Sequence, residues 1–153
     1  MNAELMFSSQ SDEWETPQWL YDDLDLEFGF DFDVCATKEN AKHVDYYDKE
    51  DDALSRPWYC AGNGRYPATC WMNPPHGRTI SRWMKKAYEE SQLGATVVCL
   101  IPARTDTKWW HEYALKGEIR FLRGRLKFGG HKNSALFPSA IVIFRPMEKL
   151  TNA

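Results

Sequence analysis

The tetrapeptide Asn73-Pro74-Pro75-His76 directly follows the apolar run Cys70-Trp71-Met72. A proline fixes its own φ near about −65°, cannot donate a ladder hydrogen bond, and moves the residue before it out of the helical region. The run therefore predicts a strand that ends abruptly and holds the Asn73 amide on stiff backbone at the edge of a sheet. Carbonyl oxygens there can accept the hydrogens of an amine, and the His76 ring offers a flat face, so the turn suits a planar, amine-bearing ring. The alternative is a proline-rich turn with a purely structural role.

The composition predicts a single globular domain over residues 1–153, because 43% of the residues are hydrophobic and 14% are aromatic. Residues 1–13 are polar and lack a period, which indicates a mobile arm. No apolar run reaches the ~18 residues of a membrane span and no signal peptide opens the chain, so a soluble, cytoplasmic protein without membrane contact is expected. The four cysteines form no CxxC pair. This spacing favours free thiols and no metal site.

The charges divide the chain into two unlike parts. Residues 1–60 contain 4 Lys/Arg against 16 Asp/Glu, whereas residues 61–153 contain 15 against 6. Such asymmetry favours a basic part that contacts a polyanion such as DNA, and an acidic part kept away from it or used on a small cationic ligand. Two ordinary solvated surfaces are the alternative.

Periodicity and breakers predict strands that alternate with helices and then strands alone, which is an α/β sheet with an antiparallel hairpin at its end. Four helices are expected. The first has an N-cap at Thr16, Pro17 at its first helical position and a stop at Gly29, and the second covers about 38–47. The third runs from Ile80 to Gly94, and the fourth starts from a cap at Thr105 or Asp106 and has Trp109, Trp110 and Tyr113 on one face. The expected strands are 30–35, 70–72, 96–101, 119–122, 126–128 and 140–144. Residues 60–69 are expected to form a loop.

Several segments occur in an order that resembles the phage-type DNA N6-adenine methyltransferases, relatives of the Dam enzymes. They are Ser11–Pro17, Asp33-Val34-Cys35-Ala36, Asp51-Asp52, Asn73-Pro74-Pro75, Leu100–Arg104 with Thr107-Lys108-Trp109, and Gly124–Phe128. The resemblance covers about Ser11 to Arg145. It implies a Rossmann-like, S-adenosylmethionine-dependent methyltransferase fold, with a mostly parallel seven-stranded sheet whose last hairpin is reversed. No separate target-recognition domain is visible.

The resemblance also implies roles for matching positions. Cofactor contacts are expected at Trp14, Thr16, Pro17, Asp33, Cys35, Ala36, Asp51 and Asp52. Carboxylates beside a sulfonium cation are favourable, and an acid can accept hydrogen bonds from ribose hydroxyls or an adenine amine. For Asp51 and Asp52, a helix cap or a solvated turn is the alternative.

The reaction that the resemblance implies is methyl transfer to N6 of a flipped-out adenine in DNA, with Asn73, Pro74, Pro75 and His76 as the catalytic group. The Asn73 oxygen and the Pro74 carbonyl would accept the N6 hydrogens. His76 would stack on the base, and Phe128 is either a second wall or part of the core. DNA contacts are expected from Arg78, Arg82, Lys108, Arg123, Arg125 and Lys127, whereas Lys85 and Lys86 fit a solvated helix face.

The chain departs from the family pattern at His76, where the family usually has Tyr or Phe. An imidazole can carry charge near neutral pH, so weaker, pH-sensitive or retargeted activity is expected. Three alternatives stay open. The turn can present cytosine N4 or a protein glutamine amide for methylation, or the chain can be a non-catalytic phage protein whose acidic face binds a host DNA-binding protein. Protection of phage DNA from host restriction is the expected purpose.

Overall fold

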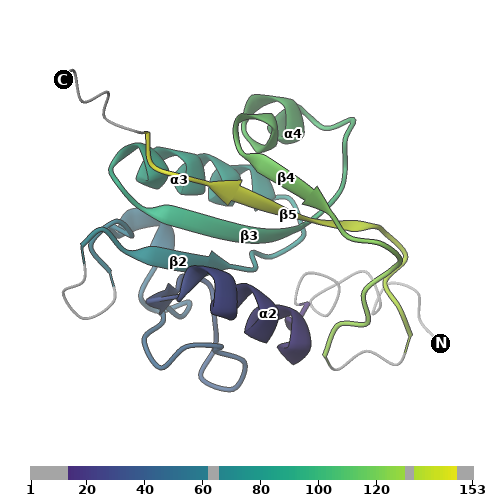
Figure 1. Ribbon diagram of the computed structural model, residues 1–153, viewed down its shortest axis with the longest axis horizontal. Coiled ribbons are helices and arrows are strands. Elements are labelled where there is room, and N and C mark those ends of the chain that lie inside the picture. Colours follow the sequence, from purple (N-terminus) through teal and green to yellow (C-terminus); the bar gives the residue numbers. More distant parts are fainter. Residues whose placement is uncertain (1–13, 62–65, 130–132, 148–153) are drawn as a thin grey trace.

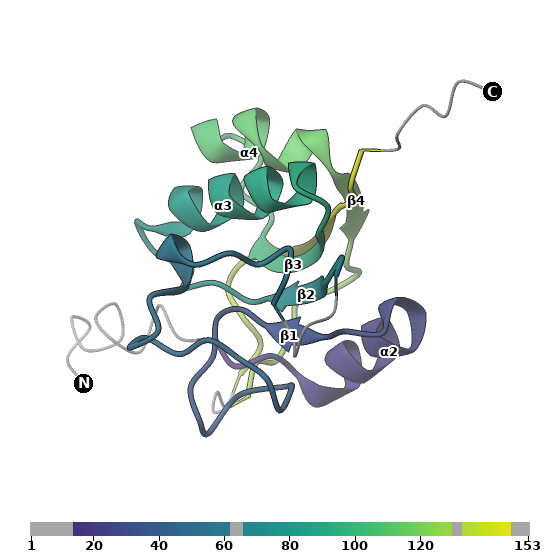
Figure 2. The same cartoon turned by 90° about the vertical axis from the view of Figure 1, so that its left-hand side faces the viewer.

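The computed structural model describes residues 14–61, 66–129 and 133–147. They form three layers, with a sheet in the middle, helices α3 and α4 on one face and helix α2 on the other (Figures 1 and 2). The elements in chain order are α2 (Gln18–Phe28), β1 (Phe32–Asp33), a 3-10 turn (Ala53–Ser55), β2 (Thr69–Met72), α3 (Ile80–Gln92), β3 (Thr96–Pro102), α4 (Lys108–Glu112), a 3-10 turn (Ala114–Lys116), β4 (Glu118–Phe121) and β5 (Ser139–Phe144). The predicted mobile arm 1–13 and the loop residues 62–65 lie outside the described residues.

The sheet has five strands in the order β1-β2-β3-β5-β4. Strands β1, β2 and β3 are parallel, and β5 runs antiparallel to both of its neighbours, β3 and β4. The predicted mixed sheet with a reversed final hairpin is therefore confirmed in outline. The described residues contain five strands rather than the seven that the resemblance implies. Strand β3 is central, as its apolar sequence indicated, but only one of its neighbours is parallel to it.

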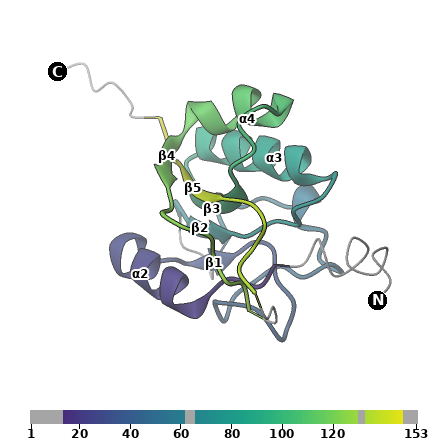
Figure 3. The same cartoon turned by 90° about the vertical axis from the view of Figure 1, so that its right-hand side faces the viewer.

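Alternate residues of the central strands supply the cores of the two outer layers. In β3, Val97, Cys99 and Ile101 pack in the cluster under α3 and α4, whereas Val98 and Leu100 pack in the cluster under α2. This alternation follows from the two-residue period of a strand and from burial of both sheet faces. The sheet therefore separates two apolar layers. Figure 3 shows α2 on one side of the sheet and α3 and α4 on the other.

The two long helices follow the predicted apolar spacing. Leu20 and Leu24 of α2 are buried, and Gly29 ends the helix in the left-handed conformation at φ 65°. In α3, Ile80 and Met84 lie on the buried face. The predicted cap at Thr16 is wrong, because Pro17 occupies the N-cap position of α2 without a side-chain cap. The Thr16 hydroxyl makes a different contact, described below.

Other predicted elements are absent or displaced. Residues 38–47 form turns instead of a helix. The Thr37 and Asn40 side chains each accept a hydrogen bond from the other's backbone N–H, at 3.2 and 2.7 Å, as at the start of a helix, but the Lys42 N–H then donates to the Asp33 carboxylate at 3.0 Å instead of continuing it. Residues 126–128 are not a strand, although Gly129 beside them bridges Glu15. Helix α4 is capped by the Thr107 hydroxyl, which accepts from the Trp110 N–H at 3.3 Å, rather than by Thr105 or Asp106. Local polar contacts thus account for the turns at 38–47 and for the cap of α4.

All four cysteines are free thiols, as their spacing predicted. Across the described ranges, no helix is long and apolar enough to cross a membrane. Among the same residues, no group of three or more His, Cys, Asp or Glu side chains is arranged to hold a metal ion.

Candidate active site

Chain segments far apart in sequence meet at one edge of the sheet. Strands β1, β2 and β3 are parallel, so their carboxyl ends lie side by side at this edge. Strand β5 is antiparallel and begins there, since Ser139 pairs with Pro102. Strand β4 ends there, since Phe121 pairs with Ala140. The segment between β4 and β5, which contains three of the six predicted DNA-contacting cations, therefore starts and finishes at the edge that carries the Asn-Pro-Pro turn.

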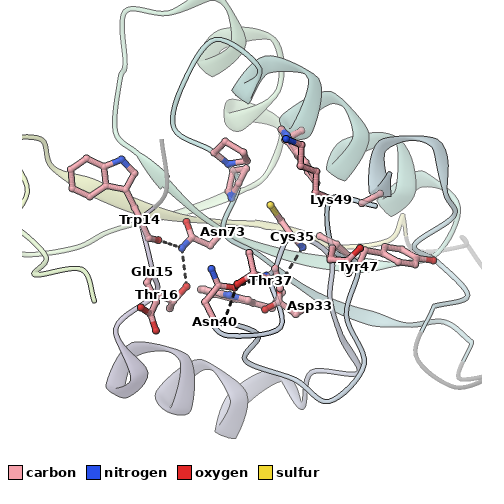
Figure 4. Close-up of a pocket in the computed structure, with 18 of the residues that line it drawn as sticks. Trp14, Glu15, Thr16, Asp33, Cys35, Thr37, Asn40, Tyr47, Lys49 and Asn73 are labelled. Carbon is pink, nitrogen blue, oxygen red and sulfur yellow. Dashed lines mark hydrogen bonds between the residues drawn. The ribbon is translucent and has the colours of Figure 1, made fainter. Parts of the chain in front are cut away.

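A pocket of about 450 Å³ opens at the carboxyl ends of β1 and β2. Nine of the residues predicted for catalysis or cofactor binding line it: Trp14, Thr16, Asp33, Cys35, Ala36, Asp52, Asn73, Pro74 and Pro75. The segments before α2, after β1 and after β2 thus meet around one cavity (Figure 4). Open α/β sheets bind ligands at this position.

Three predicted residues lie outside the pocket lining. Pro17 begins α2 instead. The Asp51 carboxylate accepts a hydrogen bond from the Asp48 N–H at 2.9 Å, and the Asp51 N–H donates to the Asp48 carboxylate at 3.0 Å, so Asp51 closes a turn. This contact corresponds to the structural alternative considered for Asp51. The third residue, His76, packs in an aromatic cluster beside the pocket.

Sequence reasoning missed a further group of lining residues. They are Glu15, Val34, Thr37, Asn40, Tyr47, Asp48, Lys49, Ala53, Leu54, Trp71 and Trp83. Most of them follow β1, but only Asn40 and Tyr47 fall in the stretch 38–47 that was expected to be a helix, and Trp83 comes from α3. The single available signal was the polar, turn-like composition after Asp45. It indicates a loop but not the cavity that the loop encloses.

The Asn73 side chain has its two ends in unlike surroundings. Its amide NH2 donates to the Trp14 carbonyl oxygen and, at 2.9 Å, to the Thr16 hydroxyl (Figure 4). Its Oδ1 atom is buried and has no hydrogen-bond partner among the described residues. Since the NH2 group is held by two acceptors, the amide orientation is settled and the free end is an acceptor. A buried acceptor without a partner is costly, and a donor supplied by a ligand would remove that cost.

His76 belongs to a cluster of four rings. Its imidazole stacks on the Trp14 indole, with centroids 6.1 Å apart and an interplanar angle of 15°. Phe128 and Phe137 contact it edge-on at 5.8 and 5.6 Å. Both imidazole nitrogens are buried and unpartnered within the described part of the chain. Burial lowers the pKa of His76 to about 3. The expectation of a charged imidazole near neutral pH is therefore wrong.

Phe128 is part of the core. It is 1% exposed and packs in the apolar layer under α2, and its ring also contacts His76 edge-on. The core interpretation is therefore confirmed, and a second wall for a flipped base stays a prediction.

Asp33 is a buried carboxyl group at the end of β1, with 2% of its surface exposed. It accepts hydrogen bonds from the Cys35 N–H at 3.2 Å and the Lys42 N–H at 3.0 Å. Burial raises the pKa of this carboxyl group to about 7, against the opposing effect of the two N–H donors. Perturbed acids in pockets are typical of functional sites, although structural networks shift pKa values as well.

All six predicted DNA-contacting cations are exposed: Arg78, Arg82, Lys108, Arg123, Arg125 and Lys127. Lys108 pairs with Glu112 at 3.5 Å, which offsets its charge. Arg125 and Lys127 alternate with the buried Leu126 and Phe128, so their charges face solvent while their neighbours anchor the segment. This segment runs into the ring cluster through Phe128 and therefore extends the site with positive charge.

Polar groups lie at the carboxyl ends of parallel strands, around a cavity large enough for a nucleotide-sized ligand. This arrangement defines an α/β protein with an enzyme-like site. The model of the family DNA N-6-adenine-methyltransferase (Dam) matches residues 5–152. The chain belongs to this family of enzymes, so the resemblance found in its sequence is confirmed.

Two phage proteins are similar to this chain. The DNA N-6-adenine-methyltransferase of Haemophilus phage HP1 (strain HP1c1) is 29% identical over 150 residues, which cover 90% of this chain and 81% of the relative. The DNA N-6-adenine-methyltransferase of Escherichia phage T1 is 27% identical over 153 residues, which cover 82% of this chain and 61% of the relative. The chain thus spans about three fifths of the T1 protein's length.

Proposed function

We propose that this protein transfers a methyl group from S-adenosylmethionine to N6 of an adenine flipped out of DNA. The observation that carries the proposal is the Asn73 amide. Its NH2 group is fixed by Trp14 and Thr16, and its buried oxygen is left without a partner. An exocyclic amine is a donor that would satisfy this oxygen, and family membership supports adenine as the base that bears it.

The pocket beside Asn73 fits the proposed cofactor in size and chemistry. Its volume of about 450 Å³ lies within the usual range for small-molecule sites. Asp33 and Asp52 supply carboxyl oxygens for hydroxyl or amine donors, and Tyr47 and Trp83 supply flat apolar surface. The bound cofactor supplies an activated methyl group on a sulfonium. The size and chemistry of the pocket, together with the reversed strand β5, also lead us to assign the methyltransferase form of the Rossmann-like fold to this sheet.

The residues of the turn act by position. The Asn73 oxygen and the Pro74 carbonyl accept the two N6 hydrogens, which directs the nitrogen lone pair away from them and toward the pocket. Holding the amine and the methyl group in line is an orientation effect, and such effects contribute several kcal/mol to catalysis. The proline backbone keeps both acceptors in place while the base enters. Flipping the base out of the duplex costs a few kcal/mol, which stacking offsets in part.

His76 is the ring on which the flipped base would stack, with Phe128 as a second wall. In the present conformation the Trp14 indole lies on the His76 face. Base stacking on that face of His76 therefore requires the indole to move aside. The uncharged imidazole is suited to a base, because no desolvated cation is left beside the adenine.

DNA would lie across the carboxyl edge of the sheet. The exposed cations after β4 and beside the Asn-Pro-Pro turn would contact backbone phosphates, and each such contact makes binding more salt-dependent. Both of the relatives described above are phage proteins. We infer that the methylation protects phage DNA against host restriction and takes place in the cytoplasm of the bacterial host.

The deciding experiment measures labelled methyl incorporation from S-adenosylmethionine into unmethylated DNA, followed by analysis of the nucleosides. N6-methyldeoxyadenosine as product would establish the reaction. N4-methylcytosine would keep the mechanism and change the base. Absence of both incorporation and cofactor binding would favour the non-catalytic binder, whose acidic face needs no cofactor.

A further inference from the structure

Arg104 stands at the edge of the sheet that carries the proposed active site. It follows β3, the parallel neighbour of strand β2, which ends directly before Asn73. Its backbone is held at both ends. The Arg104 N–H donates to the Pro102 carbonyl at 2.9 Å, and the Arg104 carbonyl accepts from the Thr107 hydroxyl at 2.7 Å. The residue therefore leaves the sheet from a fixed position.

The side chain of Arg104 reaches the ring cluster. Its guanidinium carbon lies 5.7 Å from the centroid of Phe137, within the range of a cation–π contact. The Phe137 ring in turn contacts His76 at 5.6 Å and Trp14 at 5.0 Å. The Ala103 N–H also donates to the Pro138 carbonyl at 2.8 Å, which ties the two chain segments together. The cation is thus held one ring away from the proposed base site.

The charge of Arg104 has no acidic partner among the described residues. Some other cations are offset by acidic neighbours: Lys85 pairs with Glu89 at 3.8 Å and Arg120 with Glu27 at 2.7 Å. Arg104 is nevertheless exposed and keeps a defined direction through its ring contact. A guanidinium can rest on an aromatic face and still offer its N–H fork to a phosphate in a bidentate contact.

We propose that Arg104 binds a backbone phosphate that flanks the flipped nucleotide and so positions the target base against Asn73. This inference rests on the proposed function and adds a residue to it. A flipped nucleotide stays attached to its two phosphates, which must remain at the mouth of the base site. Arg104 is fixed beside that site and has no acidic partner among the described residues, so it has the chemistry to hold one of them. Phosphate contacts of this kind set position and carry no sequence information.

The test compares Arg104→Gln with Arg104→Lys and with Lys85→Gln, a control that removes the same charge from an exposed position on α3. S-adenosylmethionine affinity and thermal unfolding should be unchanged in all three, since the Arg104 side chain is exposed and outside the pocket. Arg104→Gln should lower the slope of log DNA affinity against log salt by about 0.9, the value for one lost phosphate contact. Its single-turnover methylation rate at saturating DNA should fall about tenfold or more, because the base is misplaced.

Arg104→Lys should keep the salt slope and lose part of the rate, because lysine supplies the charge without the planar fork. The proposal would be overturned if Arg104→Gln had the same salt slope and the same single-turnover rate as Lys85→Gln. A reduced salt slope with an unchanged single-turnover rate would also overturn it, because Arg104 would then bind a phosphate without positioning the target base. Absence of DNA methylation by the wild-type protein would refute the proposed function itself. The failure of the proposed function can therefore be distinguished from the failure of the Arg104 proposal.

Discussion

The Trp14 indole lies parallel to the His76 imidazole, with ring centroids 6.1 Å apart and planes inclined by 15°. The same Trp14 residue accepts a hydrogen bond from the Asn73 NH2 through its carbonyl oxygen. Trp14, which precedes helix α2, thus covers one face of the proposed stacking ring and orients the proposed catalytic amide. Base entry and amide orientation are linked through this residue.

Removal of the indole should make His76 titrate closer to its ordinary pKa, because the imidazole would regain contact with water. We expect the pKa of His76 in Trp14→Ala to rise from about 3 toward about 6.5. The His76 Cε1–H resonance, followed by NMR against pH, measures this. Trp19→Ala is the matched control, since Trp19 is 58% exposed. An unchanged titration in Trp14→Ala would mean that the other rings alone exclude water.

Acid should destabilise the fold through His76. The pKa of His76 is lower in the native state than in the unfolded chain, so between about pH 3 and about pH 6.5 the unfolded chain binds more protons. Stability that is fully present above pH 6.5 is therefore lost as the pH falls through this window. The free energy of unfolding of His76→Phe, from chemical denaturation at pH 7.5, 5.5 and 4.5, should depend less on pH than that of wild type. His111→Phe, which removes an imidazole at an exposed position, is the control.

Methylation should show no inflection from His76 between pH 6 and 8, because the imidazole stays uncharged there. His76→Tyr and His76→Phe should then keep the wild-type shape of the rate profile over this range. The measurement is initial rate against pH at saturating cofactor and DNA. An inflection that vanishes in both variants would show that the imidazole is charged in the complex with DNA.

Loss of the Asn73 amide should abolish methylation and leave cofactor binding nearly intact. Asn73→Ala removes the acceptor for the amine, whereas the carboxyl groups proposed to hold the cofactor remain. We expect no detectable turnover and a change in S-adenosylmethionine affinity of a few-fold at most, measured by methyl incorporation and by calorimetry. Asn133→Ala, at an exposed position, should be unchanged. Retained turnover in Asn73→Ala would refute the proposed role of the amide.

Asp33 should make cofactor binding depend on pH. Burial raises the pKa of this carboxyl group to about 7, so a ligand that prefers the carboxylate should bind more tightly as the pH rises through 7. Asp33→Asn should lose this dependence and weaken binding at pH 8 about tenfold or more, since hydrogen bonds to charged groups contribute about 1.5–3 kcal/mol. Calorimetry at pH 6 and 8 tests this, with the exposed Asp23→Asn as control. Equal affinities for wild type and Asp33→Asn at pH 8 would exclude Asp33 from cofactor binding.

At pH values above its ordinary pKa, the Asp33 carboxyl group should lower the free energy of unfolding. The folded pKa of Asp33 is raised, so the native state binds more protons than the unfolded chain between about pH 4 and about pH 7. The contribution of Asp33 to stability therefore falls as the pH rises through that window. Thermal unfolding of wild type and Asp33→Asn over this range checks the sign. A contribution that rises with pH would mean that the two N–H donors outweigh burial.

Sequence alone determined the elements whose signals are local and strong. The proline pair after Met72 marked the end of β2, the apolar spacing of Leu20 and Leu24 marked α2, and the β-branched run of β3 marked a buried strand. The family resemblance, carried by short motifs in order, also came from sequence alone. Each of these signals lies within a few residues of chain, where propensity, spacing and backbone restriction act directly.

The tertiary structure decided what depends on residues far apart in the chain. The Asn73 amide is oriented by Trp14 and Thr16, more than fifty residues away, and neither contact has a local signal. The turns at 38–47 replace the expected helix because local side-chain contacts and the packed pocket outweigh a weak helical preference. The charge state of His76 was the clearest case. Its ordinary pKa is near neutral, and burial among rings from three separate segments moves it to about 3, because desolvation is a property of the fold and not of the sequence position.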